Sequence, residues 1–315
     1  MPLNKLLPLI YNIQRRNREK EFLENKGGVW VIRPGKDENL NQDVIDGFGR
    51  EWASFDYAKT NANEALDNQF KAYCSPIDLT QFNSESAVAA DIGAGSGRWS
   101  ERLMPYFSFI YVLEPSDGAI SVLETKFSNE PRIKILQESV GANSIPDTSL
   151  DLAMCLGVLH HIPNTALAIR DISSKIKSGG TFLCYLYYKL ENKPLLYRLL
   201  FKIANLVRWA VSRLPYFLRK FISQVIASLA YLPLARLAKL LLRLGKDVSN
   251  FPLHHYADMP FLMLQNDALD RFGTRLEQRF SKKDIVEMLK AAEFDISTLK
   301  FSEVEPFWTF SVKKG

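Results

Sequence analysis

The sequence predicts an α/β fold in which a mostly parallel sheet is flanked by helices. From Ser86 onward, short apolar stretches of strand length alternate with amphipathic helical stretches, which is the pattern of consecutive βαβ units. A turn containing Gly93, Gly95 and Gly97 joins the first of these strands to its helix. The 315 residues are 47% hydrophobic and 24% charged, which is a globular composition and argues against bulk disorder.

The expected elements follow in chain order from this alternation. Parallel strands are predicted at 86–93, 109–115, 132–138, 149–157 and 181–188. Helices are predicted at 98–106, 117–127 and 164–177, the last with Asn164 as its N-cap and a stop at Ser178-Gly179-Gly180. Ser281 and Asp284 predict a capping-box-like start for a helix that runs to about Glu293. Two closing strands are predicted at 294–301 and 307–314, and a short early strand at 28–34.

Composition and pattern divide the chain into four regions. These are an N-terminal extension (1–60), a Rossmann-like core (61–190), a basic helical insertion (191–265) and a C-terminal region with the last helix and two strands (266–315). The first 22 residues place an apolar stretch before charged residues, which is the reverse of a secretory signal peptide. No run of eighteen uncharged apolar residues occurs, so no membrane-spanning helix is expected.

The three cysteines give no support for a disulfide framework or a metal site. Cys74, Cys155 and Cys184 lie far apart, form no CxxC pair and have no histidine at zinc-binding spacing. We expect them to be small core residues rather than nucleophiles, in a reducing, cytoplasmic setting.

The glycine turn, Asp91-Ile92-Gly93-Ala94-Gly95-Ser96-Gly97, is the main candidate for ligand binding. Glycines let the backbone turn sharply and approach a ligand, and the following helix points its N-terminal amides at the same place. Glu114 ends the next strand, where an acidic side chain can accept hydrogen bonds from both hydroxyls of a ribose. Nicotinamide and S-adenosylmethionine binders share this arrangement.

Spacing and charge favour S-adenosylmethionine. The nicotinamide fingerprint G-x-G-x-x-G would place its third glycine at position 98, which is arginine here. The carboxylate of Asp91 before the turn disfavours a pyrophosphate and favours the ammonium and sulfonium cations of S-adenosylmethionine. A nicotinamide-dependent oxidoreductase therefore stays as a weaker alternative.

Several segments resemble class I S-adenosylmethionine-dependent methyltransferases of the small-molecule type. They are DIGAGSGR (91–98), Glu114-Pro115, PDTSLDLAMCLGVLHHI (146–162), IKSGGTF (176–182), FSKKDIVEMLKAAEF (280–294) and FGREW (48–52). The resemblance covers roughly 45–190 and 265–315. Two residues depart from the pattern: Ser178 replaces a proline and Glu293 replaces a glycine, and both concern local backbone geometry.

The resemblance implies a seven-stranded Rossmann-like sheet and a cofactor site for S-adenosyl-L-methionine. It places adenine near Glu138 and Ser139, with Val140 beside them, and the methionine part near Leu156 and Gly157. With the residues of the turn and the ribose acid, the predicted cofactor-binding set is Asp91, Gly93, Ala94, Gly95, Glu114, Pro115, Glu138, Ser139, Leu156 and Gly157. No metal is expected.

Two histidine pairs are candidates for chemistry. His160 and His161 follow the fourth strand, on the loop that faces the transferred methyl group in the fold that the resemblance implies. Histidine has a pKa suited to a general base for a hydroxyl acceptor, while the alternative is that the pair only packs the loop. His254 and His255 could enter the same pocket from a lid or lie on a surface turn.

The segment 192–246 carries eleven Lys or Arg and no Asp or Glu, although the whole chain has a net charge of only +5. Its leucine-rich helical periodicity, with Arg198, Lys202 and Arg208 on one stripe, is typical of a helix on an anionic membrane surface. The alternative is a lid with its basic face in water. Pro215 and Pro233 are expected to divide the segment into about three helices.

These observations predict methyl transfer to a small molecule. A hydroxyl acceptor is favoured, and the insertion suggests an amphiphilic one, such as a lipid-linked sugar or isoprenoid precursor. A non-catalytic S-adenosylmethionine-binding or regulatory protein is the alternative from another class. No nucleic-acid partner is expected, because aromatic residues are not interleaved with the basic ones. The sequence does not determine the oligomeric state.

Overall fold

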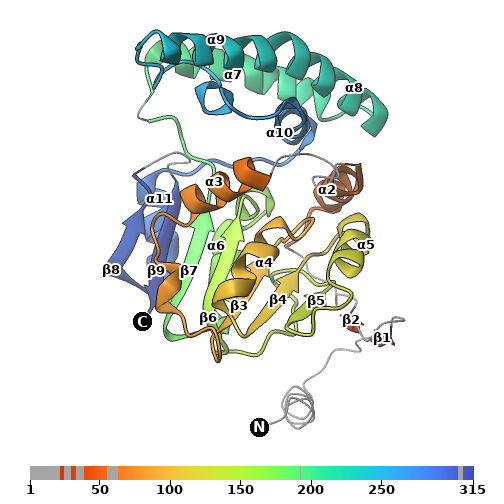
Figure 1. Ribbon diagram of the computed structural model, residues 1–315, viewed down its shortest axis with the longest axis vertical. Coiled ribbons are helices and arrows are strands. Elements are labelled where there is room, and N and C mark those ends of the chain that lie inside the picture. Colours follow the sequence, from red (N-terminus) through yellow and green to blue (C-terminus); the bar gives the residue numbers. More distant parts are fainter. Residues whose placement is uncertain (1–21, 25–29, 33–38, 55–62, 192, 304–307) are drawn as a thin grey trace.

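The computed structural model describes residues 22–24, 30–32, 39–54, 63–191, 193–303 and 308–315. Figure 1 shows a central sheet with helices on both faces and a helical layer across one end. Of the strand predicted at 28–34, residues Trp30–Ile32 form β2, which pairs antiparallel with β1 (Phe22–Glu24). The apolar-then-basic start of the chain lies outside the described residues.

The main sheet has seven strands in the order β5-β4-β3-β6-β7-β9-β8. Five are parallel, and β9 is antiparallel to both β7 and β8. The strands are β3 (Val88–Ile92), β4 (Phe109–Leu113), β5 (Ile133–Leu136), β6 (Leu150–Leu156), β7 (Ile176–Tyr185), β8 (Phe294–Phe301) and β9 (Thr309–Lys314). The predicted seven-stranded Rossmann-like sheet is confirmed.

Two of the core helices, α6 and α11, begin at the N-terminal caps that the sequence predicts. The Asn164 side chain accepts a hydrogen bond from the Leu167 amide, and Ser281 and Asp284 form a complete capping box. The helices are α2 (Gln42–Ser54), α3 (Asn63–Tyr73), α4 (Arg98–Leu103), α5 (Asp117–Lys126), α6 (Thr165–Lys175) and α11 (Lys282–Ala291). The helix predicted to reach 177 ends at 175, because Ile176 pairs with Leu150 and starts β7.

The hydrophobic core lies on both faces of the sheet. Along β3, Ala89 packs into one apolar layer and Ala90 into the other, and both side chains are fully buried. Small residues at these positions let the helices approach the sheet closely. The three cysteines are free and buried, as predicted for core residues.

The insertion consists of α7 (Leu195–Val211), α8 (Tyr216–Ile226), a π-helical turn (Ala227–Tyr231), α9 (Leu232–Arg243) and α10 (Phe261–Gly273). Pro215 precedes α8, as predicted. Pro233 does not break the helix, because it lies in the first turn of α9, where proline is tolerated. The π-helical turn before α9 keeps the helix continuous from α8 into α9. The boundary predicted at 265/266 falls inside α10, so this helix belongs to the insertion.

The continuous helix Tyr216–Arg243 is long and apolar enough to cross a membrane by length and composition alone, with a mean hydropathy of 1.7 over an 18-residue stretch. Length and composition do not place this helix across a membrane, so the sequence expectation of no membrane-spanning helix stays a prediction. That expectation rested on an uninterrupted uncharged run, whereas this helix contains an 18-residue stretch that stays apolar on average with at most two charged residues.

Several cations of the insertion point toward the protein rather than toward solvent. Arg219 is buried and donates to the Gly273 carbonyl at 2.8 Å, and Arg208 donates to the Thr274 carbonyl at 3.0 Å. Arg236 donates to the Ala257 carbonyl at 2.8 Å. The expectation of one exposed, purely cationic face is therefore wrong, because part of the charge holds the insertion on the segment 257–274.

Candidate active site

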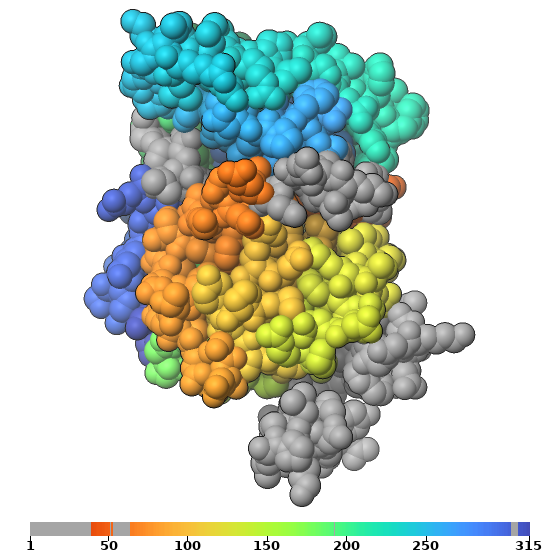
Figure 2. All heavy atoms as spheres, in the orientation of Figure 1, coloured from red at the N-terminus to blue at the C-terminus, as the bar shows by residue number. Residues whose placement is uncertain are grey.

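A cavity of about 1070 Å³ lies between the carboxyl ends of the parallel strands and the insertion. Its size is at the upper end of the roughly 300–1,000 Å³ of small-molecule sites. Figure 2 shows the insertion as a continuous layer over the core. The cavity lies at the edge where ligands bind in open parallel sheets, and it has room for more than one small molecule.

The glycine turn needs glycine at its first two positions. Gly93 and Gly95 have φ values of +72° and +56°, in the left-handed region. A Cβ on Gly93 would lie 2.5 Å from Val158, and one on Gly95 would lie 2.7 Å from the Trp52 ring. Any side chain here would displace residues that line the cavity.

Glu114 is held in place at the end of β4. One carboxylate oxygen accepts from the Gly95 amide at 3.0 Å, and the other accepts from the Ser116 amide and hydroxyl at 3.0 and 2.7 Å. Burial raises the pKa of Glu114, and these hydrogen bonds oppose that shift. A carboxylate has about four lone-pair sites and three are used here, so the side chain can still accept from one ligand hydroxyl.

Most of the predicted cofactor residues meet at one end of the cavity. They are Gly93, Ala94, Glu114, Pro115, Glu138, Ser139, Leu156 and Gly157. Asp91 and Gly95 do not line the cavity. Gly95 contributes through its amide, which orients Glu114, and the Trp52 ring covers it.

Asp91 lies beneath the turn, where it is 1% exposed and accepts a hydrogen bond from the Ser100 hydroxyl at 2.6 Å. Burial raises its pKa to about 6 from the ordinary value of 3.8, although the Ser100 hydrogen bond works in the opposite direction. The charged carboxylate is therefore less stable here than in the unfolded chain.

The substitution Asp91→Asn should stabilise the ligand-free protein above pH 6. A carboxyl whose pKa is raised by folding contributes stability below about pH 4 and loses it as the pH rises through 6. Asparagine keeps an oxygen for Ser100 but carries no charge, so we expect a gain of about 1–3 kcal/mol at pH 8 and about half of that gain at pH 5. Urea unfolding at both pH values measures this, with the exposed Asp117→Asn as control. An equal effect at both pH values would contradict the assignment.

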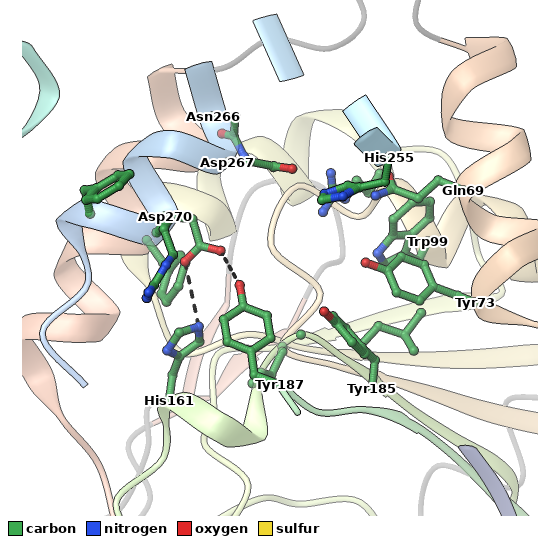
Figure 3. Close-up of a pocket in the computed structure, with 18 of the residues that line it drawn as sticks. Gln69, Tyr73, Trp99, His161, Tyr185, Tyr187, His255, Asn266, Asp267 and Asp270 are labelled. Carbon is green, nitrogen blue, oxygen red and sulfur yellow. Dashed lines mark hydrogen bonds and ion pairs between the residues drawn. The ribbon is translucent and has the colours of Figure 1, made fainter. Parts of the chain in front are cut away.

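The other end of the cavity contains His161, Tyr187 and Asp270 (Figure 3). His161 Nδ1 lies 2.7 Å from the Leu276 carbonyl, which only accepts, so Nδ1 carries the proton and Nε2 is left as the acceptor. Nε2 lies 3.7 Å from one oxygen of Asp270, whose other oxygen accepts from the Tyr187 hydroxyl at 2.9 Å. His161 thus lines the cavity with a buried Nε2 that has no hydrogen-bond partner among the described residues and lies beside a fixed carboxylate.

His160 has a different environment from its neighbour. It is fully buried, does not line the cavity, and stacks on the Tyr187 ring with centroids 3.7 Å apart. Burial lowers its pKa well below the ordinary value. The predicted pair therefore separates into His161 at the cavity and His160 behind Tyr187, and direct contact of His160 with a ligand is excluded in this structure.

Sequence reasoning missed most of the acceptor end. The missed residues come from α3, from the end of β7 and from α10: Gln69, Tyr73, Tyr185, Tyr187, Asn266, Asp267 and Asp270 (Figure 3). The polar spacing of 266, 267 and 270 on one turn of α10 was the available signal. Burial raises the pKa of Asp267 to about 6. His254 and His255, considered from the sequence, do line the cavity.

The FGREW segment covers the site from α2. Phe48 packs against His161 with ring centroids 5.1 Å apart, and Arg98 lies 5.0 Å above the Trp52 ring. Close contact of Gly49 with α5 fixes this helix, since a Cβ on Gly118 would lie 2.2 Å from the Gly49 carbonyl oxygen. Among the described residues, no group of three His, Cys, Asp or Glu side chains could hold a metal ion.

The part of the chain around the glycine turn matches known proteins. Residues 90–184 match a family model described as "Methyltransferase domain". "Uncharacterized methyltransferase YcgJ" of Bacillus subtilis is 26% identical over 108 residues, 33% of this chain and 42% of that protein. "Probable S-adenosylmethionine-dependent methyltransferase CRG1" of Saccharomyces cerevisiae is 29% identical over 106 residues, 32% of this chain and 36% of that protein. The chain spans less than half the length of these curated relatives.

The comparison with solved structures also finds methyltransferases, at low similarity. The crystal structure of human N-acetylserotonin methyltransferase in complex with S-adenosylmethionine has a TM-score of 0.46 and 16% identity, over 80% of this chain and 53% of that one. The family match at 90–184 includes the glycine turn, Glu114 and both histidines of the pair.

Proposed function

Starting from the class I S-adenosylmethionine-dependent methyltransferase domain in this chain, we propose that the protein methylates a hydroxyl group of a small amphiphilic acceptor, with His161 as the general base. The observation that carries this proposal is His161 Nε2, a buried nitrogen with no hydrogen-bond partner among the described residues, at the acceptor end of a cavity whose other end is the cofactor site. Both ends share one cavity, as a direct transfer requires.

The residues at the cofactor end fit S-adenosylmethionine. Glu114 offers a carboxylate oxygen to a ribose hydroxyl, and Glu138 and Ser139 border the expected adenine position. Gly157 has a φ of +80°, and a Cβ there would meet only the Tyr185 ring at 4.0 Å, so its backbone opens onto free space. The buried carboxylate of Asp91 adds negative charge beneath the turn, which suits a cationic ligand.

The chain's own residues supply alignment and proton removal. The bound cofactor supplies a methyl group on a sulfonium, which the acceptor oxygen displaces to leave a neutral thioether. His161 Nε2 takes the hydroxyl proton, and its other nitrogen stays fixed by the Leu276 carbonyl. The Asp270 carboxylate, held by Tyr187, lies where it stabilises the positive charge that forms on the imidazole.

An amphiphilic acceptor is supported by the lining of the cavity beneath the insertion. The residues that α7, α8 and the π-helical turn contribute are almost all apolar or aromatic, and we call them the apolar arm: Tyr197, Leu200, Phe201, Ala204, Ile226, Ala230 and Tyr231. A hydrocarbon portion in this arm would leave its hydroxyl near the polar cluster at His161.

A series of para-alkyl phenols tests the acceptor class. Each buried methylene contributes about 0.8 kcal/mol, so kcat/KM should rise about fourfold per added carbon until the apolar arm is filled. Ala204→Phe narrows the arm and should lower the chain length at which the rise stops. The exposed Ala210→Phe on the same helix is the matched control. A kcat/KM that stays flat along the series would contradict an amphiphilic acceptor.

A further inference from the structure

The insertion presents an apolar face to solvent that no packing within the described chain explains. The layer formed by α7, α8 and α9 is the part of the molecule furthest from the sheet, with α10 beneath it (Figure 1). Twelve of its large hydrophobic side chains are between 38% and 80% exposed, and we call them the outer face: Leu195, Leu196, Leu199, Ile203, Leu206, Phe217, Phe221, Val225, Leu229, Leu237, Leu240 and Leu244.

The outer face does not result from loose packing of the whole layer, because the opposite sides of α8, the π-helical turn and α9 are packed on the protein and Val211 is buried at the end of α7. Ala227, Ala235 and Ala238 are fully buried, and Tyr231 packs against Tyr256 with ring centroids 5.6 Å apart. The buried guanidinium of Arg219 further fixes this side. The helices therefore have a settled inner side and an equally regular apolar outer side, at a spacing of three or four residues.

The charged side chains of the segment that carries the outer face, 192–246, all have one sign. Arg198 and Lys202 lie one turn apart beside the apolar stripe of α7, and Arg243 and Lys246 lie at the end of α9. All four side chains are exposed, and none forms an ion pair with another described residue. With no Asp or Glu between 192 and 246, the surface complements a partner that is both apolar and anionic.

We propose that the outer face docks this protein on the surface of an anionic lipid bilayer, with its leucine and phenylalanine side chains inserted among the acyl chains. A bilayer satisfies both features at once, since a broad apolar layer lies beneath a plane of negative headgroups. A spanning arrangement would instead pull Tyr216–Arg243 away from α10 and expose Arg219, so the helix lies along the surface.

The position of the cavity connects this docking with the proposed function. Leu200 lines the apolar arm and is also 47% exposed on α7, next to the outer face. The inner and outer sides of one helix layer thus border the acceptor site and the bilayer. An amphiphilic acceptor dissolved in that bilayer would reach the arm without crossing water. The docking itself stands independently of the methylation chemistry.

Flotation of the full chain with lipid vesicles tests the docking. Phosphatidylcholine vesicles containing phosphatidylglycerol should bind the protein, and pure phosphatidylcholine should bind it more weakly. The reason is that each exposed cation raises the binding affinity for an anionic surface about fivefold. Raising the salt to about 1 M should reduce the difference, since the Debye length falls to about 3 Å. The triple variant L199Q/I203Q/L206Q should lose binding to both vesicle types.

Two further variants separate the electrostatic contribution to vesicle binding from the apolar contribution of the outer face. R198Q/K202Q/R243Q/K246Q should keep weak binding to both vesicle types and lose the preference for anionic lipid. Leu167→Gln, which removes a leucine that is 40% exposed on α6, should bind like the unmodified chain. Unchanged affinity for adenosylhomocysteine in every variant shows that the core is folded. The proposal is overturned if the unmodified chain stays with neither vesicle type, or if the triple variant floats normally. It is also overturned if sedimentation shows that the triple variant changes the protein from a dimer to a monomer while vesicle binding stays the same. The outer face would then bind a second copy of the chain.

Discussion

Replacing His161 by alanine is expected to lower kcat by about 10²–10⁴-fold, the range that a positioned general base contributes. The reason is geometric: Nδ1 is committed to the Leu276 carbonyl at 2.7 Å, so Nε2 is the atom left to take a proton. The residue lies at the acceptor end of the cavity, away from Glu114. Adenosylhomocysteine affinity, measured by calorimetry, should therefore remain within about twofold.

His160→Phe is the matched control for this prediction. Phenylalanine can keep the stacking on Tyr187, and His160 does not line the cavity, so turnover should persist in this variant. Free imidazole should restore part of the activity of His161→Ala, because the substitution leaves space beside Asp270. If His161→Ala keeps full turnover, or if both variants lose it equally, the histidine is structural and the base lies elsewhere.

Replacing Glu114 by alanine is expected to weaken adenosylhomocysteine binding by about 1–3 kcal/mol, or roughly 5- to 150-fold. The carboxylate is aligned by the Gly95 and Ser116 amides at 3.0 Å and lines the cofactor end of the cavity. The substitution removes both the ligand's acceptor and the group that satisfies these two amides. Calorimetric titration measures the loss, and thermal unfolding reports any separate effect on the fold.

Glu101→Ala is the control for charge alone. Glu101 is an exposed carboxyl on α4, paired with Lys126 at 2.9 Å, and it does not line the cavity. Its removal should leave the affinity unchanged. Equal affinity in Glu114→Ala and the unmodified chain would mean that the ribose is held by other groups, and the cofactor site would have to be reassigned.

The cofactor end could be predicted from sequence because local features define it. A strand that ends in a glycine turn and a second strand that ends in Glu114 are both short-range patterns, and parallel pairing of β3 with β4 brings them together. The seven strands were equally predictable from their apolar periodicity. Asp91 lies on β3 just before the turn, as the sequence indicates, yet its side chain accepts from Ser100, which spacing alone does not reveal.

The acceptor end could not be predicted because it depends on contacts between distant segments. Asp270 meets His161 only after α10 folds back over β7, more than a hundred residues along the chain. The orientation of the helices in the insertion could not be predicted for a related reason. Its periodicity shows two faces, but the carbonyls of Ala257, Gly273 and Thr274 decide that several arginines face inward and the leucines outward.

The most direct test of the account follows a labelled methyl group. The purified chain is incubated with S-adenosylmethionine carrying a ¹³C-methyl group and with a lipid extract, and both phases are analysed by mass spectrometry. We expect one labelled methyl ether in the organic phase and an equal amount of adenosylhomocysteine in the aqueous phase. Tight adenosylhomocysteine binding without consumption of the donor would make the chain a non-catalytic binder. Reduction of NAD in the same extract, with no transfer of label, would instead contradict the assignment of the cofactor.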